Sequence, residues 1–273
     1  MILRMEFTQN GYNYRISNGR LDGDRIVSTT VEGDFSEVHF GSRSDGKDLE
    51  KICLKIAKDE SCNDLLANEA EILEKLEHKS LPVLLDGFEF KDGRCVNVLK
   101  EIEDSYDLYT MREHFPDGLD QFHASWVFQR LLSVLGYLHT NNVIHGSIEP
   151  GNIMVTPKNH NGLLIDFTLA IQDAHEKCAK YMGTNDYSAP EISKRKKPAP
   201  TSDLYSLGRS MVYLLGGEGK DIPRHVDSDF RGFLEKFLTE EPRYRIKDAW
   251  KAWHQLNDLR ERYLDHTNLW NLK

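Results

Sequence analysis

Short apolar runs, separated by clusters of Gly, Asp and Ser, dominate the first 63 residues of the chain. Runs of this length, rich in β-branched and aromatic residues and bounded by turn formers, are typical of β-strands. The pattern therefore predicts strands at 12–16, 26–30, 37–40, 52–56, 78–90 and 94–100. We expect a β-rich N-terminal part of about one hundred residues.

Apolar residues with helical spacing occur once within this part and repeatedly after it. In residues 64–77 they fall on one stripe, at Leu65, Leu66, Ile72, Leu73 and Leu76. The same spacing predicts a long helix over 121–140 and a C-terminal helix over 247–264. The predicted class is α+β, with a small β-rich part that carries one main helix, followed by a larger helical part.

A predicted hairpin stands at the centre of the larger part. Two apolar runs, 153–155 and 163–165, flank a polar turn that contains Pro, Asn and Gly residues. A tight hairpin over these residues would bring Asn152, just before the first run, close to Asp166, just after the second. An amide oxygen and a carboxylate at one hairpin end suit Mg²⁺. An ordinary buried hairpin with incidental polar ends is the alternative interpretation.

Composition narrows the class of protein. The chain has 273 residues, of which 39% are hydrophobic and 29% charged, and its net charge of −9 argues against non-specific nucleic-acid binding. Its four cysteines are scattered without metal-ligand spacing, which favours reduced thiols and a cytoplasmic location. We expect no signal peptide and no membrane span, because no apolar run is long enough.

The central hairpin and the loop before it resemble a known family. Residues 145–152 read His-Gly-Ser-Ile-Glu-Pro-Gly-Asn, and 166–168 read Asp-Phe-Thr. These stretches resemble the His-Arg-Asp-x-x-x-x-Asn loop and the Asp-Phe-Gly motif of the protein kinase family. Four positions match the family pattern, namely His145, Asn152, Asp166 and Phe167. Four depart from it: Gly146 replaces Arg, Ser147 replaces Asp, Glu149 replaces Lys and Thr168 replaces Gly.

Further motifs follow in the family's order. Residues 183–191 are close to the Gly-Thr-x-x-Tyr-x-Ala-Pro-Glu that closes the kinase activation segment. The resemblance implies that Glu191 is buried against Arg245, and that Asp203 braces the backbone of the catalytic loop. It also implies that His145 packs under Phe167 and does no chemistry. Each acid taken alone could instead be a helix cap or a surface ion pair.

The resemblance implies a two-lobed fold, with an N-terminal lobe over 1–100, a C-terminal lobe over 101–273 and the hinge near Glu101. Lys55, which ends an apolar strand, would pair with Glu69 of the 64–77 helix and hold ATP phosphates. The alternative is that Lys55 is a solvated edge residue and Glu69 a surface acid. The full set of implied nucleotide-site residues is Gly33, Val38, Cys53, Lys55, Glu69, Glu101 and Met154.

Two implications of the N-terminal lobe stay open at this point. The 31–38 turn keeps the central Gly33 of the family's glycine-rich loop but lacks its outer glycines, so we expect weak contact with phosphates. One alignment puts Lys100 at the back of the adenine pocket, whereas another points it into solvent.

The implied function is Mg-ATP binding, with Asn152 and Asp166 as the metal ligands. Ser147 is a poor general base, and Glu149 would repel the γ-phosphate that a lysine normally neutralises. The favoured hypothesis is therefore a pseudokinase that acts as a binding or regulatory module with a protein partner. A low-activity Ser/Thr kinase that uses Glu149 as its base, and an ATP-dependent transferase of another group such as AMP, are the alternatives.

Three smaller expectations follow. Gly146 in place of Arg predicts that phosphorylation of the activation loop does not switch the protein on. Thr168 in place of Gly predicts a fixed conformation of the Asp-Phe turn. The brief polar stretch 215–230 predicts a trimmed docking face, and Leu269 and Trp270 of the C-terminal tail are expected to pack on the body.

Overall fold

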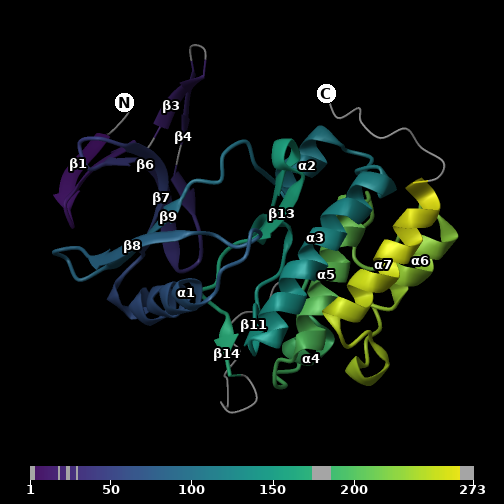
Figure 1. Ribbon diagram of the computed structural model, residues 1–273. Coiled ribbons are helices and arrows are strands. Elements are labelled where there is room, and N and C mark those ends of the chain that lie inside the picture. The colour runs from purple at the N-terminus through teal and green to yellow at the C-terminus, as the bar shows by residue number, and fades with distance from the viewer. Residues whose placement is uncertain (1–3, 18, 23–24, 29, 174–185, 265–273) are drawn as a thin grey trace. The chain divides into compact units, whose positions relative to one another are not determined.

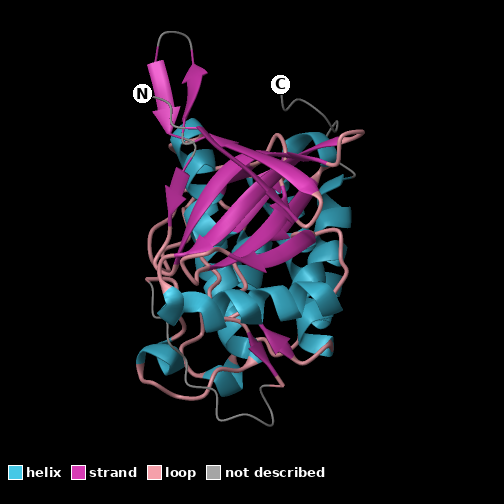
Figure 2. Cartoon of the chain, turned by 90° about the vertical axis from the view of Figure 1, so that its left-hand side faces the viewer, coloured by secondary structure: helices cyan, strands magenta, loops and turns pink. Residues whose placement is uncertain are grey.

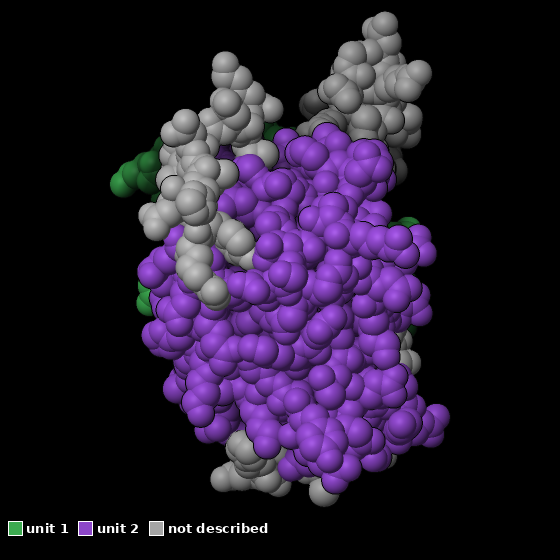
Figure 3. All heavy atoms as spheres, turned by 90° about the vertical axis from the view of Figure 1, so that its right-hand side faces the viewer, with its two compact units in different colours: residues 1–77, 82–103 green, residues 78–81, 104–273 purple. Residues whose placement is uncertain are grey.

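A computed structural model describes residues 4–17, 19–22, 25–28, 30–173 and 186–264 of the chain (Figure 1). The chain forms two compact units, coloured separately in Figure 3. One comprises residues 1–77 and 82–103, and the other comprises 78–81 and 104–273. Residues 183–185 of the activation-segment motif, Cys178 and the tail from 267 lie outside the described residues.

The smaller unit is built on a seven-stranded antiparallel sheet, seen as magenta arrows in Figure 2. Its strand order is β1-β2-β6-β7-β9-β8, and β5 pairs with β6. The strands are β1 (Arg4–Gln9), β2 (Tyr12–Ser17), β5 (Thr30–Glu32), β6 (Ser36–Ser44), β7 (Leu49–Ala57), β8 (Leu84–Glu89) and β9 (Cys95–Lys100). A separate hairpin joins β3 (Gly19–Asp22) and β4 (Arg25–Ser28). The predicted β-rich part is therefore confirmed.

Alternating side chains of the central strands form the core of this sheet. The buried members are Tyr14, Ile16, Ile52, Leu54, Ile56, Val96 and Val98. Aromatic rings close one side, where Phe7 stacks on Tyr14 with ring centroids 4.8 Å apart. Helix α1 (Asn63–Lys75) buries Leu66, Glu69, Ile72 and Leu73. Leu65 and Leu76, the other two members of the expected apolar stripe, are only half-buried. Burial of this apolar stripe holds α1 in place more firmly than its helix propensity would.

Three strand predictions need correction. The predicted strand 26–30 is divided between β4 and β5. The predicted strand 78–90 begins only at Leu84, because the N–H of Leu81 donates to the carbonyl of His78 at 2.9 Å and closes a turn. Strand β1 was not predicted, although Met5 and Phe7 alternate with polar residues.

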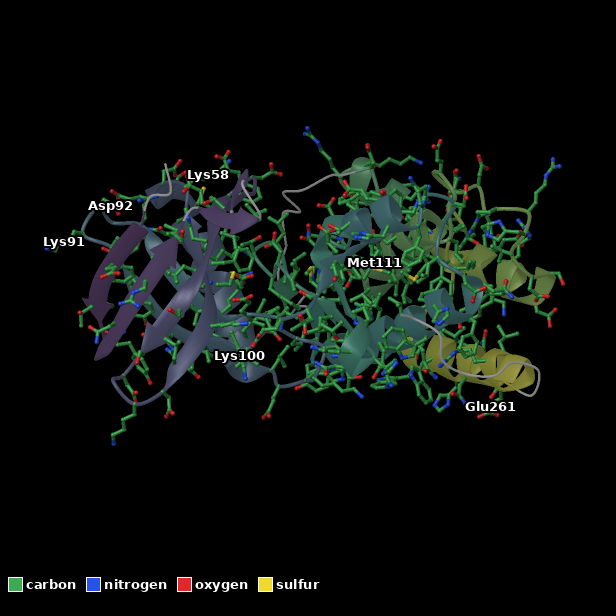
Figure 4. The ribbon with its side chains drawn as sticks, turned by 90° about the horizontal axis from the view of Figure 1, so that it is seen from above. Lys58, Lys91, Asp92, Lys100, Met111 and Glu261 are labelled. Carbon is green, nitrogen blue, oxygen red and sulfur yellow. The ribbon has the colours of Figure 1, made fainter. Side chains whose placement is uncertain are left out.

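The larger unit is mainly helical. Its helices are α2 (Leu108–His114), α3 (Gln121–Thr140), α4 (Pro190–Ser193), α5 (Pro200–Leu214), α6 (Ser228–Glu235) and α7 (Ala249–Leu264). Helix α3, predicted with the same bounds, runs beside α5 and α7 in Figure 1 and contacts both. Asp120 caps its start by accepting a hydrogen bond from the N–H of Phe122. Met111 of α2, labelled in Figure 4, is buried.

Two small sheets complete this unit. Strands β12 (Ile153–Thr156) and β13 (Asn161–Leu164) form the predicted hairpin, and β10 (Tyr106–Asp107) pairs with β12. Strand β11 (Val143–Ile144) pairs with β14 (Ile171–Gln172). Residues 215–227 contain no helix, but α6 begins at Ser228, inside the stretch 215–230 where the sequence predicted that a helix is nearly absent. Among the described residues, no helix combines the length and the apolar character needed to cross a bilayer.

Alanine substitution at two helical glycines of this unit is expected to change the free energy of unfolding in opposite directions. A Cβ at Gly208 of α5 would lie 2.6 Å from Cβ of the fully buried Phe237, whereas a Cβ at Gly232 of α6 would meet nothing within 4 Å. We expect Gly208→Ala to lower the free energy of unfolding by about 1–3 kcal/mol through overpacking. Gly232→Ala should raise it by roughly 0.5–1 kcal/mol, because alanine is the better helix former. Urea denaturation of both variants measures this, and equal effects would contradict it.

Candidate functional site

Lys55 and Glu69 form a buried ion pair within the smaller unit. Strand β7 places Lys55 opposite Asn97 of β9 and Val38 of β6, and its side chain is only 6% exposed. Its Nζ lies 2.8 Å from Oε1 of Glu69, which is fully buried on α1. The alternative of a solvated lysine is therefore wrong. A buried pair of this kind adds little net stability, because desolvation of both charges offsets their attraction.

Asn97 completes this arrangement, and the sequence analysis missed it. Its Nδ2 donates to Oε2 of Glu69 at 3.1 Å and to the carbonyl of Leu66 at 2.9 Å, and the residue is 3% exposed. Lys55 and Asn97 therefore engage different carboxylate oxygens of Glu69. The available signal was a polar residue between Val96 and Val98 in strand β9, since buried amides need partners.

The other predicted residues of this unit lie on nearby strands. Gly33 occupies the exposed turn between β5 and β6, and its N–H donates to the carbonyl of Ser36 at 2.9 Å. Val38 and Cys53 are half-buried in β6 and β7, and burial raises the pKa of Cys53 to about 12, so its thiol stays neutral. Glu101, also half-buried, follows β9 and donates its N–H to the carbonyl of Lys51.

The exposure of the Lys100 side chain bears on the two alignments that the sequence left open. This side chain, labelled in Figure 4, is exposed at the end of β9. This exposure favours the alternative in which Lys100 points into solvent.

In the larger unit, one buried carboxylate holds the loop that begins at His145. Asp203 of α5 accepts the backbone N–H groups of His145 at 2.9 Å and Gly146 at 3.0 Å. Its Oδ2 also lies 2.9 Å from Nε2 of His139, at the end of α3. Asp203 is 2% exposed, so these partners satisfy a charge that would otherwise be costly to bury. The predicted bracing of the loop backbone is present.

His145 is a structural residue in this loop. Its ring is fully buried, its Nε2 lies 3.1 Å from the carbonyl of Ile165, and its ring centroid lies 4.6 Å from that of Phe167. The predicted packing of His145 against Phe167 is therefore observed. The contact links the loop before the hairpin to the Asp-Phe-Thr turn after it.

The hairpin brings Asn152 and Asp166 together, as its pattern predicted. Ile153 pairs with Leu164, and the N–H of Ile165 donates to the carbonyl of Asn152 at 3.0 Å. The side-chain nitrogen of Asn152 donates to the carbonyl of Ser147 at 2.9 Å and to its hydroxyl at 3.2 Å. These two hydrogen bonds use only the nitrogen, so the amide oxygen Oδ1 remains an oxygen donor that a metal could take.

Thr168 has a role that the sequence analysis did not foresee. Asp166 adopts a left-handed φ of 65°, and the hydroxyl of Thr168 donates to its Oδ1 at 2.6 Å. The N–H of Thr168 donates to the same oxygen at 3.3 Å. Thr168 is 3% exposed, so it fixes the rotamer of the Asp166 carboxylate from a buried position. A glycine at 168 would lack this hydroxyl.

The remaining predicted site residues of the larger unit are Ser147, Glu149 and Met154. Ser147 is half-buried, and its N–H donates to Nδ1 of His145 at 3.3 Å. Glu149 is also half-buried. The pKa of the Tyr109 phenol is raised by the burial of Tyr109 itself and by the negative charge of Glu149. Met154 lies in β12, paired with Leu163 and Asp107.

The described end of the activation-segment motif is anchored by a second buried ion pair. Nη1 and Nη2 of Arg245 donate to the two carboxylate oxygens of Glu191 at 2.7 Å and 3.0 Å. Ser202 donates its hydroxyl to Glu191 at 2.9 Å. Arg245 has a fully buried side chain and also donates to three backbone carbonyls, so every side of its guanidinium is engaged.

The donor set fits a magnesium-bound triphosphate. Asn152 and Asp166 offer an amide oxygen and a carboxylate, and Mg²⁺ takes its remaining ligands from water and phosphates. Across the described residues, no group of three or more His, Cys, Asp or Glu side chains forms a closed metal centre. The arrangement therefore suits a metal that arrives with its ligand better than a permanently bound structural ion.

Comparisons with known proteins agree with this geometry. The profile described as "Protein kinase domain" matches residues 29–258. Serine/threonine-protein kinase TIO of Arabidopsis thaliana is 27% identical over 83% of this chain and 18% of its own length. Calcium/calmodulin-dependent protein kinase type 1 of Caenorhabditis elegans is 27% identical over 86% of this chain and 65% of its own length.

A third relative, serine/threonine-protein kinase PLK4 of Drosophila grimshawi, is 26% identical over 72% of this chain and 28% of its own length. The chain thus spans between 18% and 65% of the length of these three relatives. The family profile covers well over half of the chain, and the hairpin, the Lys55–Glu69 pair and the Glu191–Arg245 pair lie inside the matched range. The chain therefore belongs to the protein kinase domain family.

Proposed function

We propose that this chain binds Mg-ATP and transfers its γ-phosphate slowly or not at all, so that it acts as a regulatory or binding module. One observation carries the proposal. Ser147 occupies the position of the expected aspartate, and its hydroxyl accepts a hydrogen bond from Asn152. A neutral hydroxyl has almost no capacity to accept a proton from a substrate alcohol near pH 7.

The binding half of the proposal rests on charge and position. Lys55, held by Glu69, would contact phosphates with its ammonium group, while Asp166 and Asn152 would hold the metal. When bound, the metal would neutralise charge that develops on the phosphates. Thr168 orients the Asp166 carboxylate in advance, which reduces the cost of ordering the site on binding.

The proposal that phosphate transfer is slow or absent rests on two residues, Ser147 and Glu149, that replace charged residues of the family pattern. Ser147 removes the acceptor of the substrate proton, which is worth about 10²–10⁴-fold in rate. Glu149 places a negative charge where a lysine would neutralise the γ-phosphate, which removes a further electrostatic contribution to the transition state. Both losses fall on the chemical step and leave nucleotide binding largely unaffected.

The binding proposal is tested by the melting-temperature shift that ATP and Mg²⁺ produce. At a ligand concentration of 100 Kd, binding stabilises the native state by about 2.7 kcal/mol, which raises Tm by roughly 5–10 °C for a chain of this size. Lys55→Met should abolish most of this shift. Lys51→Met is the matched control, because Lys51 lies on the same strand but its side chain is 58% exposed and pairs with Glu103 at the surface.

The comparison uses the shift caused by ligand, since Lys55→Met also leaves Glu69 without its ammonium partner and lowers the starting Tm. An unchanged Tm of the wild-type protein with ATP and Mg²⁺ would reject the binding proposal. An equal loss in Lys51→Met would show that Lys55 has no special part in it.

A second function, low-activity transfer to Ser or Thr hydroxyls of a protein, is favoured by one observation. Glu149 supplies a half-buried carboxylate two residues after Ser147 in the same loop. An ionised carboxylate at this position could accept the substrate proton. We propose a protein as substrate or partner in either case, and the variants that separate the two functions are treated in the Discussion.

A further inference from the structure

A pocket of about 310 Å³ lies in the larger unit, on residues that the proposed function does not use. It is bounded by the end of α3, by the strand residues Val143 and Ile144, and by 197–200 before and at the start of α5. Its volume is at the low end of the range for small-molecule sites, so it suits a small ligand better than an extended peptide.

The polar side chains of this pocket carry nitrogen atoms that can donate hydrogen bonds, His139 through Nδ1 only when its ring is doubly protonated. His139, Asn142 and Lys197 line it, and none of the described lining residues is acidic. Its other walls are apolar, formed by Val143, Ile144 and residues 198–200. The pocket therefore combines a positive, donor-rich part with an apolar part, which matches an anion attached to an apolar body.

His139 gives this pocket a defined hydrogen-bonding group. Its Nε2 lies 2.9 Å from the carboxylate of Asp203. Within the described part of the chain, its Nδ1 makes no hydrogen bond. Because Asp203 is a buried acceptor of backbone N–H groups, the ring nitrogen that faces it carries a proton. A carboxylate can accept a hydrogen bond from Nδ1 only when that nitrogen carries a proton, and the ring then lies between two negative groups.

The surrounding charge also favours an anion. Lys197 ends a run of four consecutive basic residues, 194–197, and all four are exposed. This local positive charge stands out in a chain whose net charge is −9. Such a cluster raises the local concentration of anions near the pocket mouth.

We propose that this pocket is a site for a small organic carboxylate with an apolar body, bound through His139 and Lys197. Occupancy is coupled to the catalytic loop, because Asp203 joins His139 to the backbone N–H groups of His145 and Gly146. A ligand that forms a hydrogen bond with the His139 ring therefore changes the hydrogen bonds of Asp203 that hold this loop. The site needs neither ATP nor phosphate transfer.

Sodium benzoate is the probe, and benzamidine, which has nearly the same shape and the opposite charge, is its control. Titration of the full chain at low salt, followed by ¹H–¹⁵N NMR, should show benzoate binding with a Kd on the order of 1 mM, as expected for so small a ligand. The His139 ring and the amides of His145 and Gly146 should shift together. Benzamidine and acetate should leave them in place, the first for its charge and the second for its lack of an apolar body.

Three variants and one control variant locate the site. Lys197→Glu should weaken benzoate binding about tenfold, whereas Lys194→Glu, the same charge change outside the pocket lining, should alter it much less. Ala199→Phe should fill the cavity and block binding. His139→Gln keeps a donor for Asp203 while it removes Nδ1, and should also weaken binding; circular dichroism checks that each variant is folded.

The proposal is overturned by any of four results. The first is no benzoate-dependent shift at about ten times the expected Kd. The second is equal binding of benzamidine. The third is binding that Ala199→Phe and Lys197→Glu leave unchanged. A response to an acidic peptide without any response to benzoate would also overturn it, because the ligand would then be a macromolecular segment.

Discussion

Ser147→Asp is expected to raise the rate of γ-phosphate transfer to a protein substrate by about 10²-fold or more, within the range for a restored general base. The structure offers the new carboxylate a position. Asn152 already donates its amide N–H to the Ser147 hydroxyl at 3.2 Å, and an aspartate there could accept the same hydrogen bond. The Asp203 contacts that hold the loop involve backbone groups of His145 and Gly146, so they do not depend on the side chain at 147.

Radiolabel transfer from γ-³²P ATP to a generic substrate, such as casein, measures this effect. Ser147→Asn is the matched control, because it has nearly the shape of aspartate but no basic oxygen of comparable strength. Asp166→Asn in the Ser147→Asp background should abolish the gained activity by removing a metal-binding charge. Equal rates in Ser147→Asp and Ser147→Asn would mean that the missing acid is not what limits transfer.

Glu149→Gln distinguishes the two proposed functions in the same assay. If Glu149 is a substitute base, the wild-type protein has measurable activity that Glu149→Gln removes and Ser147→Ala retains. In a module without useful transfer, the wild-type rate is at background and Glu149→Gln does not lower it. A rise in activity with Glu149→Gln would instead favour repulsion of the γ-phosphate as the role of this residue.

Arg245→Leu is expected to lower the free energy of unfolding by about 3–5 kcal/mol, the usual effect of removing one partner of a buried ion pair. The side chain of Arg245 is fully buried, and that of Glu191 is 7% exposed. Loss of Arg245 would leave the Glu191 carboxylate with the Ser202 hydroxyl as its side-chain partner among the described residues. The carbonyls of Thr201, Thr239 and Glu240 would lose a donor as well.

Urea or thermal denaturation measures the loss, and Arg243→Leu is the control. Arg243 lies two residues away and is exposed, so its removal should change stability by no more than about 0.5 kcal/mol. The double variant Glu191→Leu/Arg245→Leu should recover part of the loss, because no charge is then left unpaired. A loss below about 1 kcal/mol in Arg245→Leu would show that solvent or a rearranged partner compensates the carboxylate.

The pH dependence of the free energy of unfolding provides a second test of the Glu191–Arg245 pair. Burial is the largest single effect and opposes ionisation of Glu191. The hydrogen bonds and the charge of Arg245, together with hydrogen bonds from the backbone and from Ser202, outweigh it, so the pKa of Glu191 is lowered from its ordinary value. The pair therefore stabilises the fold above the ordinary glutamate pKa. This stabilisation is lost as the pH falls through the lowered pKa. Glu191→Gln should remove this acid-dependent contribution.

Much of the fold followed from local patterns. Helix α3 has its predicted bounds because its apolar residues repeat with helical spacing and Asp120 caps its start. The β12–β13 hairpin was predicted from two apolar runs and their turn residues, and its register brings Asn152 and Asp166 together. Strand ends were less predictable. The turn at 78–81 depends on a hydrogen bond between His78 and Leu81 that an apolar pattern does not encode.

The Lys55–Glu69 pair was also accessible from the chain alone, because an amine at the end of an apolar strand needs a charged partner. Strand pairing determined the rest of its surroundings: the register of β7 with β9 sets Asn97 opposite Lys55, and that proximity spans 42 residues of chain. The same holds for Arg245 and Glu191, which are 54 residues apart. Motif order suggested this second pair, whereas its bidentate geometry follows from helix packing.

Residue types and their spacing were enough to identify the family, the hairpin and the absence of an acid at position 147. The direction of each side chain was not encoded in that way. The Thr168 hydroxyl on Asp166, the Asn152 amide on Ser147 and the open ring nitrogen of His139 each depend on rotamers. Rotamers are selected by the atoms packed around them, and most of those atoms come from distant parts of the chain.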